Sequence, residues 1–128
     1  AYLAVCGLPL ADEKHAENVV HAALEIREFM ANRSKELGAK TFEIRIGINT
    51  GVVVAGNIGS ADRLEYTVIG DDVNIAARLE QLNKEHGTSV LLGENTYELA
   101  KDQFKFKELG GFQLKGKEKI IQVYRVSD

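Results

Sequence analysis

The stretch EYTVIGDDVNIAARLEQL, residues 65–82, constrains the fold of this chain most strongly. Residues 66–69 form a strand-like run, and Gly70 interrupts it. The apolar residues that follow keep the i, i+4, i+7 spacing of one buried helical stripe: Ile75, Leu79 and Leu82. A strand that leads directly into an amphipathic helix predicts a domain in which helices pack on a sheet.

The first third of the chain predicts a strand followed by a long helix. The apolar run at residues 2–6 is typical of a buried strand, which Gly7 and Pro9 would end. Asp12 can cap the helix that follows, and Gly38 stands where a C-cap belongs. Between them, apolar residues at helical spacing form the expected buried stripe: Val19, Ala22, Ala23, Ile26, Phe29, Met30 and Leu37.

The middle of the chain predicts a β-hairpin. In residues 42–48, apolar side chains alternate with Glu43, Arg45 and Gly47, which is the pattern of a strand with one buried face. Residues 49–51, Asn-Thr-Gly, suit a tight turn, and residues 52–58 would return as the second strand. The polar segment GSADRLE that follows is expected to be a loop.

The last third predicts a strand at 89–92, a short helix at 94–101 and a hairpin at 104–126 with Gly110 and Gly111 in its first bend. Helices and strands therefore interleave around one sheet. We expect an α+β fold, an α/β sandwich in which helices pack on an antiparallel or mixed sheet. A length of 128 residues suits one domain, so residues 1–128 are assigned to a single domain.

Composition narrows the possible partners. A formal net charge of −3 argues against a nucleic-acid partner and offers no basic patch for direct membrane contact. No apolar run reaches the roughly 18–20 residues that a membrane span needs. Cys6 is the single cysteine, so it permits no internal disulfide, which suits a cytoplasmic location. The residues His15, His21 and His86 have neither the i, i+4 spacing nor the nearby cysteines of a zinc site.

The helix after Gly70 carries the candidate chemistry. Asp71 or Asp72 can cap it, because a carboxylate accepts hydrogen bonds from the first backbone N–H groups. Asn74 and Arg78 are four residues apart and therefore project from one side of the helix near its N-terminus. That end attracts anions, and an arginine adds planar donors that suit phosphate oxygens. By pattern alone, an ordinary solvated helix face is the alternative.

Two segments resemble a known family. The run RIGINTGVVVAGNIGSADRLEYTVIGDDVNIAARLE and the later run LKGKEKIIQVYRV are similar, in motif and spacing, to the catalytic domains of class III nucleotidyl cyclases, which are adenylyl or guanylyl cyclases. This resemblance implies a ferredoxin-like fold and a homodimer with each active site in the cleft between two protomers. It also implies that the 3′-hydroxyl of ATP or GTP attacks the α-phosphorus and expels pyrophosphate, assisted by two metal ions, Mg²⁺ or Mn²⁺.

The resemblance implies roles for four residues. Asn74 matches the residue that holds the ribose, and Arg78 matches the residue that stabilises charge on the five-coordinate phosphorus. Thr67 stands where the family reads the purine edge. Its hydroxyl can accept a hydrogen bond from the adenine N6 amine, which favours ATP, although it can also donate to a guanine carbonyl. Lys115 matches the lysine that contacts the terminal phosphates.

Lys117 and Lys119 leave the lysine assignment open. They alternate with Lys115 on one face of the expected strand, so any of the three could reach the phosphates. The alternative for this group is a charged hairpin edge that blocks pairing with another sheet.

The metal ligands are expected outside this chain. The resemblance places the two metal-binding aspartates upstream of Ala1, together with the first strand or strands of the sheet. Asp71 and Asp72 fit a helix cap more simply, and Asp62 and Glu65 have no spacing that requires a metal. The chain is therefore expected to be the C-terminal portion of a cyclase domain, and we expect it to be inactive by itself.

More than one function remains open. The longer protein is expected to be an adenylate cyclase, a phosphorus–oxygen lyase that forms 3′,5′-cyclic AMP for intracellular signalling. The alternatives are a guanylate cyclase and a catalytically inactive cyclase-like module that binds nucleotide or supports dimerisation. The sequence carries no P-loop signature, because GNIG lacks the Gly-Lys-Ser/Thr ending that such a loop needs.

Overall fold

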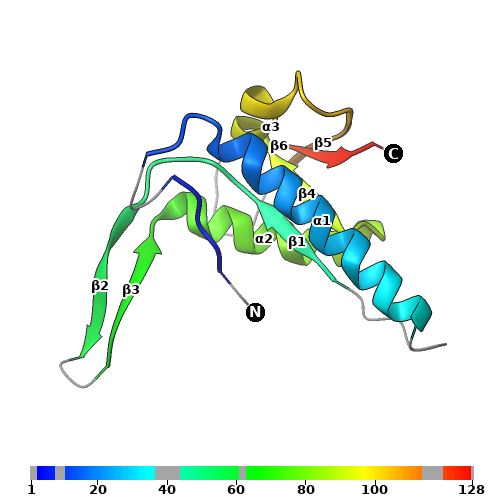
Figure 1. Cartoon of the computed structure of the whole chain (residues 1–128). Coiled ribbons are helices and arrows are strands. Elements are labelled where there is room, and N and C mark those ends of the chain that lie inside the picture. The colour runs from blue at the N-terminus through cyan, green and yellow to red at the C-terminus, as the bar shows by residue number, and fades with distance from the viewer. Residues whose placement is uncertain (1–2, 8–10, 37–43, 61–62, 114–119, 128) are drawn as a thin grey trace.

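Helices and strands alternate along the part of the chain that the structure describes (Figure 1). The computed structural model describes residues 3–7, 11–36, 44–60, 63–113 and 120–127, with the backbone alone at 57–60 and 63–67. The elements follow in the order α1 (His15–Glu36), β1 (Ile46–Ile48), β2 (Val54–Ser60), β3 (Arg63–Ile69), α2 (Asp71–His86), β4 (Val90–Gly93), α3 (Glu94–Ala100), β5 (Phe106–Gln113) and β6 (Ile120–Val126).

A four-stranded mixed sheet in the order β1-β4-β6-β5 forms the centre of the fold. β1 runs parallel to β4, with Ile46 opposite Val90, and β6 runs antiparallel to both of its neighbours. β2 and β3 form a separate antiparallel hairpin, which projects from the body of the molecule (Figure 1). The predicted α+β class with a mixed sheet and packed helices is confirmed.

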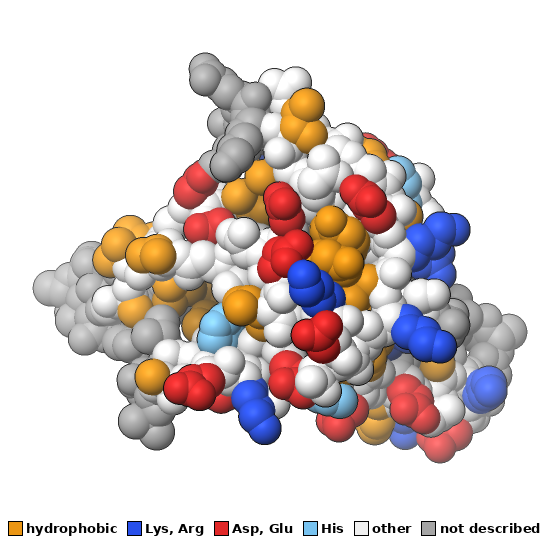
Figure 2. All heavy atoms as spheres, turned by 90° about the horizontal axis from the view of Figure 1, so that it is seen from above, with side chains coloured by type: hydrophobic (Ala, Val, Ile, Leu, Met, Phe, Trp, Pro, Cys, Tyr) orange, Lys and Arg blue, Asp and Glu red, His pale blue; other side chains and the backbone are white. Residues whose placement is uncertain are grey.

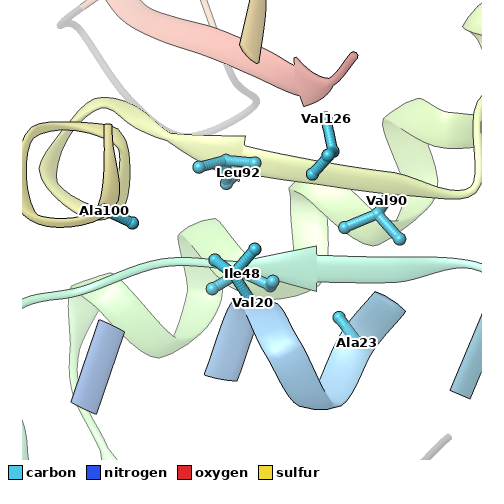
Figure 3. Packing of buried hydrophobic residues seen from close by; sticks show 7 residues of the cluster. All are labelled: Val20, Ala23, Ile48, Val90, Leu92, Ala100 and Val126. Carbon is cyan, nitrogen blue, oxygen red and sulfur yellow. The ribbon is translucent and has the colours of Figure 1, made fainter. Parts of the chain in front are cut away.

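β4 is buried on both faces, because helices pack against opposite sides of the sheet. Its side chains alternate between two clusters: Val90 and Leu92 pack with residues of α1, whereas Leu91 packs with residues of α2. The first cluster consists of Val20, Ala23, Ile48, Val90, Leu92, Ala100 and Val126 (Figure 3). The second consists of Ile75, Leu79, Leu91 and Val123. A continuous apolar run is what a strand covered on both faces requires.

The predicted first helix is present, but its buried stripe differs from the prediction. Asp12 Oδ1 accepts a hydrogen bond from the backbone N–H of Lys14 at 2.9 Å, just before α1 begins. The buried residues of the helix are Ala16, Val20 and Ala23. Ile26 and Phe29 are 45% and 62% exposed, because the core covers only the first half of the helix. Leu37 and Gly38 lie outside the described residues.

The predicted N-terminal strand is wrong for the residues that can be compared. Residues 3–5 are irregular, and Leu3 and Val5 are 55% and 44% exposed. None of the described strands pairs with this segment. A strand needs a neighbour for its backbone hydrogen bonds, so an apolar run without one stays irregular.

The predicted hairpin over 42–58 is also wrong. β1 pairs with β4, and β2 pairs with β3, so that the hairpin in this region extends from Val54 to Ile69. Most of the segment GSADRLE, predicted as a loop, belongs to the strands of that hairpin, while residues 61–62 lie outside the described residues. Tertiary contacts of residues 49–51 explain the difference. The Thr50 hydroxyl lies 2.8 Å from the Thr96 hydroxyl on α3, so this segment leaves the sheet instead of turning back along it.

The C-terminal hairpin is confirmed, although Gly110 and Gly111 are not in its bend. Both lie inside β5, which pairs with β6 as far as Gln113 and Ile120. Gly110 has a φ of +115° and sits at an irregularity of the ladder next to Glu108. Glycine suits this position because a side chain would strain a backbone with such a φ.

Candidate active site

Asn74 and Arg78 lie one turn apart on the outer side of α2. Asn74 is exposed and Arg78 is half-buried. Arg78 Nη1 donates a hydrogen bond to Gln81 Oε1 at 3.2 Å. The inner side of the helix buries Ile75 and Leu79, as predicted, whereas Leu82, the third residue of the predicted stripe, is only partly buried. Solvent can therefore reach the pair while the rest of the helix is anchored in the core.

Gly70, and not an acidic residue, is the N-cap of α2. Its φ is +150°, and no side chain makes a cap hydrogen bond. The prediction that Asp71 or Asp72 caps this helix is therefore wrong. Both residues lie in the first turn, where a negative charge interacts favourably with the positive end of the helix dipole.

Asp72 is held from the sheet by Asn49, the residue that directly follows β1. Asn49 Nδ2 donates to Asp72 Oδ1 at 2.9 Å and to the Asp72 backbone oxygen at 3.1 Å. Gly51 leaves the space for this carboxylate, since a Cβ at position 51 would overlap Asp72 Oδ2. Sequence reasoning missed this contact because it treated residues 49–51 as a turn. Asn49 and Asp72 are 23 positions apart, so no local signal could have linked them.

β1 and α2 pack backbone against backbone at Gly47. A Cβ at this position would overlap the backbone oxygen of Ala76 and the backbone nitrogen of Glu80. The absence of a side chain thus lets the helix lie directly on the strand. This close approach sets the distance between the sheet and the helix that carries Asn74 and Arg78.

A second asparagine fixes the other end of the same pair of elements. Asn83 is fully buried in α2, and its Nδ2 donates to the Ile46 backbone oxygen at 3.0 Å. The Thr88 hydroxyl donates to Asn83 Oδ1 at 2.7 Å. α2 is therefore tied to the β1 segment near both ends, by Asn49 at its start and by Asn83 near its last turn.

The other predicted substrate-binding residues are less fully described. Thr67 lies on β3 opposite Gly56, on the strand that leads into α2, and only its backbone is described. Lys115 lies outside the described residues, as do Lys117 and Lys119. The structure thus brings Asn74 and Arg78 together and places Thr67 on the element next to them in the chain.

The residues that the structure describes do not fit a metal centre. They contain no group of three or more His, Cys, Asp and Glu side chains that could hold a metal ion. His21 packs edge-on against Phe104, with ring centroids 4.7 Å apart, and His86 packs similarly against Phe112 at 5.1 Å. No metal ion is therefore assigned to a described residue.

Cys6 is half-buried rather than part of a buried strand. Its Sγ lies 3.5 Å from Asp12 Oδ2. Partial burial and the neighbouring carboxylate raise the pKa of the Cys6 thiol. A raised pKa disfavours the thiolate, which is the form in which a cysteine acts as a nucleophile.

The sequence matches the family model of the adenylate and guanylate cyclase catalytic domain over residues 1–127. The chain belongs to this family. Named proteins and solved structures of adenylyl and guanylyl cyclases are similar to nearly the whole chain. The helix that carries Asn74 and Arg78 is therefore a helix of a cyclase catalytic domain.

Adenylate cyclase 1 of Rhizobium meliloti (strain 1021) is 39% identical over 126 residues, which cover 96% of this chain and 19% of that protein. The crystal structure of the adenylyl cyclase CyaB from P. aeruginosa is 33% identical with a TM-score of 0.82, over 94% of this chain and 64% of that one. The catalytic core of a rhodopsin-guanylyl cyclase with converted specificity, in complex with ATPαS, is 31% identical with a TM-score of 0.76. That match covers 94% of this chain and 63% of that one. This domain thus spans about a fifth of the length of the Rhizobium relative.

None of the helices in the described part of the chain is long and apolar enough to cross a bilayer. Acidic, basic and apolar side chains are interspersed on the face shown in Figure 2. The visible surface of that face therefore presents no block of a single charge.

Proposed function

We propose that the protein containing this domain is an adenylate cyclase that converts ATP to 3′,5′-cyclic AMP and pyrophosphate. The carrying observation is the Asn74–Arg78 pair on the accessible side of α2 in a cyclase-family domain. In this reaction a bond forms between the 3′-oxygen and the α-phosphorus, and the bond from that phosphorus to pyrophosphate breaks. The proton of the 3′-hydroxyl passes to solvent or to a base.

Arg78 would stabilise the negative charge that builds up on the phosphorus oxygens during this exchange. A guanidinium is permanently charged and has five N–H donors. The hydrogen bond to Gln81 involves one terminal nitrogen, Nη1, so the group can bind a phosphoryl oxygen while that bond persists. Asn74, one turn earlier, would hold the ribose so that its 3′-hydroxyl faces the phosphorus. Positioning and electrostatics of this kind supply most of the catalysis in phosphoryl chemistry.

Two further assignments rest on the sequence match. Thr67 would read the purine edge, and Lys115 would bind the terminal phosphates, with Lys117 and Lys119 as its neighbours. Strand β3 supports the first assignment, because it carries Thr67 to within four residues of the first turn of α2. The protein would act as a homodimer with its active sites between protomers.

Cyclase catalytic domains typically use divalent metal ions. We propose that two such ions, Mg²⁺ or Mn²⁺, assist the reaction, and the described residues contain no group of three or more His, Cys, Asp and Glu side chains that could hold one. No part of the role assigned to Asn74 or Arg78 requires a metal ligand in this chain.

Guanylate cyclase activity is the second candidate. The family model covers both activities, and a rhodopsin-guanylyl cyclase core with converted specificity was solved in complex with ATPαS. The Thr67 hydroxyl can serve as either donor or acceptor, so it is compatible with both bases. A catalytically inactive cyclase-like module is the third candidate.

The test is a cyclase assay of the full-length protein with ATP and GTP supplied separately, each with Mg²⁺ and with Mn²⁺. We expect cyclic AMP as the main product. Cyclic GMP as the sole product would replace the proposal with guanylate cyclase. Binding of nucleotide without either product would identify an inactive module.

A further inference from the structure

Asn49 and Asp72 form a contact that none of the roles above uses. The single amide nitrogen of Asn49 donates both to the carboxylate and to the backbone oxygen of Asp72. Asp72 belongs to the first turn of α2 and precedes Asn74 by two residues. The side chain that directly follows β1 is therefore hydrogen-bonded to the helical turn from which Asn74 projects.

This contact joins the start of α2 to the end of β1. Gly70 contributes no side-chain cap, and the backbone N–H of Asn74 donates to the Gly70 oxygen over a long 3.4 Å. The first turn of a helix has backbone N–H groups without helical partners, so uncapped turns fray. Asn49 does not cap these N–H groups, because it donates to two oxygens of Asp72; its hydrogen bonds instead tie the turn to the end of β1.

The surroundings of Asn49 give it a defined position. The next residue, Thr50, is fixed to α3 by its hydroxyl contact with Thr96 at 2.8 Å and by Asn95 Nδ2, which donates to the Thr50 backbone oxygen at 3.0 Å. A Cβ at Gly93 would lie 2.6 Å from Asn49 Oδ1, so the glycine there allows this orientation of the amide. The donor that reaches Asp72 thus stands on an anchored segment.

We propose that Asn49 is a positioning residue for the cyclase reaction. Through Asp72 it sets the orientation of the first turns of α2, and thereby the directions in which Asn74 and Arg78 meet the nucleotide. This inference rests on the proposed function. A displacement of about 1 Å at a reacting group can cost on the order of 10²-fold in rate, so a loosened turn is enough to lower turnover.

The test compares four variants of the full-length enzyme. Asn49→Ala removes both hydrogen bonds, and we expect kcat to fall about tenfold or more while KM for ATP stays within about twofold. Asp72→Asn keeps an oxygen that can accept from Asn49, so its kcat should stay within about threefold of the wild type. Gly51→Ala displaces the Asp72 carboxylate without changing either partner and should give an intermediate loss. Asn18→Ala is the matched control, since it removes an amide-to-carboxylate hydrogen bond, to Asp12 Oδ2, on α1 and away from α2.

Two further measurements separate positioning from general destabilisation. Hydrogen exchange in the first turn of α2 should be faster in Asn49→Ala and unchanged in Asn18→Ala. In an Asn74→Ala background, adding Asn49→Ala should reduce kcat by less than it does in the wild type, because the part of the loss that acts through Asn74 is already present.

Unchanged kcat in Asn49→Ala, or a loss in Asn18→Ala as large as that in Asn49→Ala, would overturn the proposal. Fully additive effects of Asn49→Ala and Asn74→Ala would overturn it too. A wild-type enzyme without any cyclase activity would refute the proposed function instead, and hydrogen exchange would still show whether Asn49 holds the helix.

Discussion

Arg78 combines a permanent charge with an accessible position on an anchored helix. One face of α2 is buried through Ile75 and Leu79, and Arg78 stands half-buried on the other side. Anchoring keeps the guanidinium in place before the substrate binds, which is the condition for electrostatic catalysis. The role is therefore expected to appear in turnover rather than in substrate affinity.

Arg78→Ala in the full-length protein should lower kcat by roughly 10²–10³-fold with a much smaller change in KM, because the proposed interaction would form mainly in the transition state. Steady-state kinetics with ATP measure both constants. Arg33→Ala is the control, since Arg33 is an exposed arginine on α1 whose ion pair is with Glu36. A rise in KM at constant kcat would instead show that Arg78 binds the ground-state phosphates.

Asp12 makes the stability of the first helix dependent on pH. Two hydrogen bonds lower the pKa of Asp12. The larger effect comes from the Lys14 backbone N–H, and the smaller comes from Asn18 Nδ2. A carboxylate whose pKa is lower in the folded state stabilises the fold above its unfolded pKa, and loses that effect as the pH falls through the folded value.

Asp12→Ala should therefore lower the midpoint of thermal unfolding at neutral pH. The difference from the wild type should shrink as the pH falls below about 4, the ordinary pKa of an aspartate. Thermal unfolding of both proteins across this range measures the difference. A difference that stays constant down to the lowest pH at which both proteins fold would show that the Asp12 charge contributes nothing.

At the scale of elements, β1 and α2 behave as one unit. Gly47 brings their backbones into contact, and Asn49 and Asn83 add side-chain hydrogen bonds toward the two ends of the helix. Contacts between the backbones of two elements leave little room for adjustment, because neither can move without its whole element. The sheet therefore sets the position of the helix that carries Asn74 and Arg78.

Gly47→Ala should destabilise the domain by about 2 kcal/mol or more, because the added methyl overlaps backbone atoms of Ala76 and Glu80. Urea denaturation measures the loss. Gly56→Ala is the matched control within a strand, since a Cβ there meets nothing within 4 Å, and its effect should stay within about 0.5 kcal/mol. Equal stability of Gly47→Ala and wild type would mean that α2 can move away from β1.

At the scale of the whole molecule, the β2–β3 hairpin stands apart from the core (Figure 1). Apolar side chains near its base are exposed in the single chain: Val52 at 92%, Val54 at 64% and Ile69 at 51%. Exposed apolar groups that gather in one region are typical of surfaces that bind a partner. They are consistent with the proposed homodimer.

The specific activity of the full-length enzyme should therefore fall on dilution, because the proposed active site needs two protomers. Analytical ultracentrifugation over the same concentrations should show the dimer dissociating in parallel. A monomer with constant specific activity would contradict the shared site. A dimer whose activity is insensitive to Val54→Asp and to dilution would place the interface elsewhere.

The sequence predicted the elements whose pattern is local. The stripe Ile75, Leu79 and the short apolar run of β4 gave the correct helix and strand, since periodicity reports directly which side of an element is buried. The motifs around Asn74 and Arg78 also indicated the cyclase family by their resemblance to it, and the family model matches residues 1–127. The apolar run at residues 2–6 was wrongly predicted for a related reason. Its pattern suits a strand, but a local pattern does not show whether a partner strand lies beside it.

Only the tertiary structure decided how these elements are joined. Whether residues 49–51 turn back or cross to the hairpin depends on Asn49, Thr50 and their distant partners on α2 and α3. Asn83 occupies a position of the buried stripe where an apolar residue is expected, and only the Ile46 and Thr88 groups around it make a buried amide favourable. Such contacts link residues tens of positions apart, and their free energy exists only once the chain has brought them together. Local sequence pattern therefore determined α2, β4 and the family, whereas strand pairing and the placement of α2 on β1 were decided by long-range packing and hydrogen bonding.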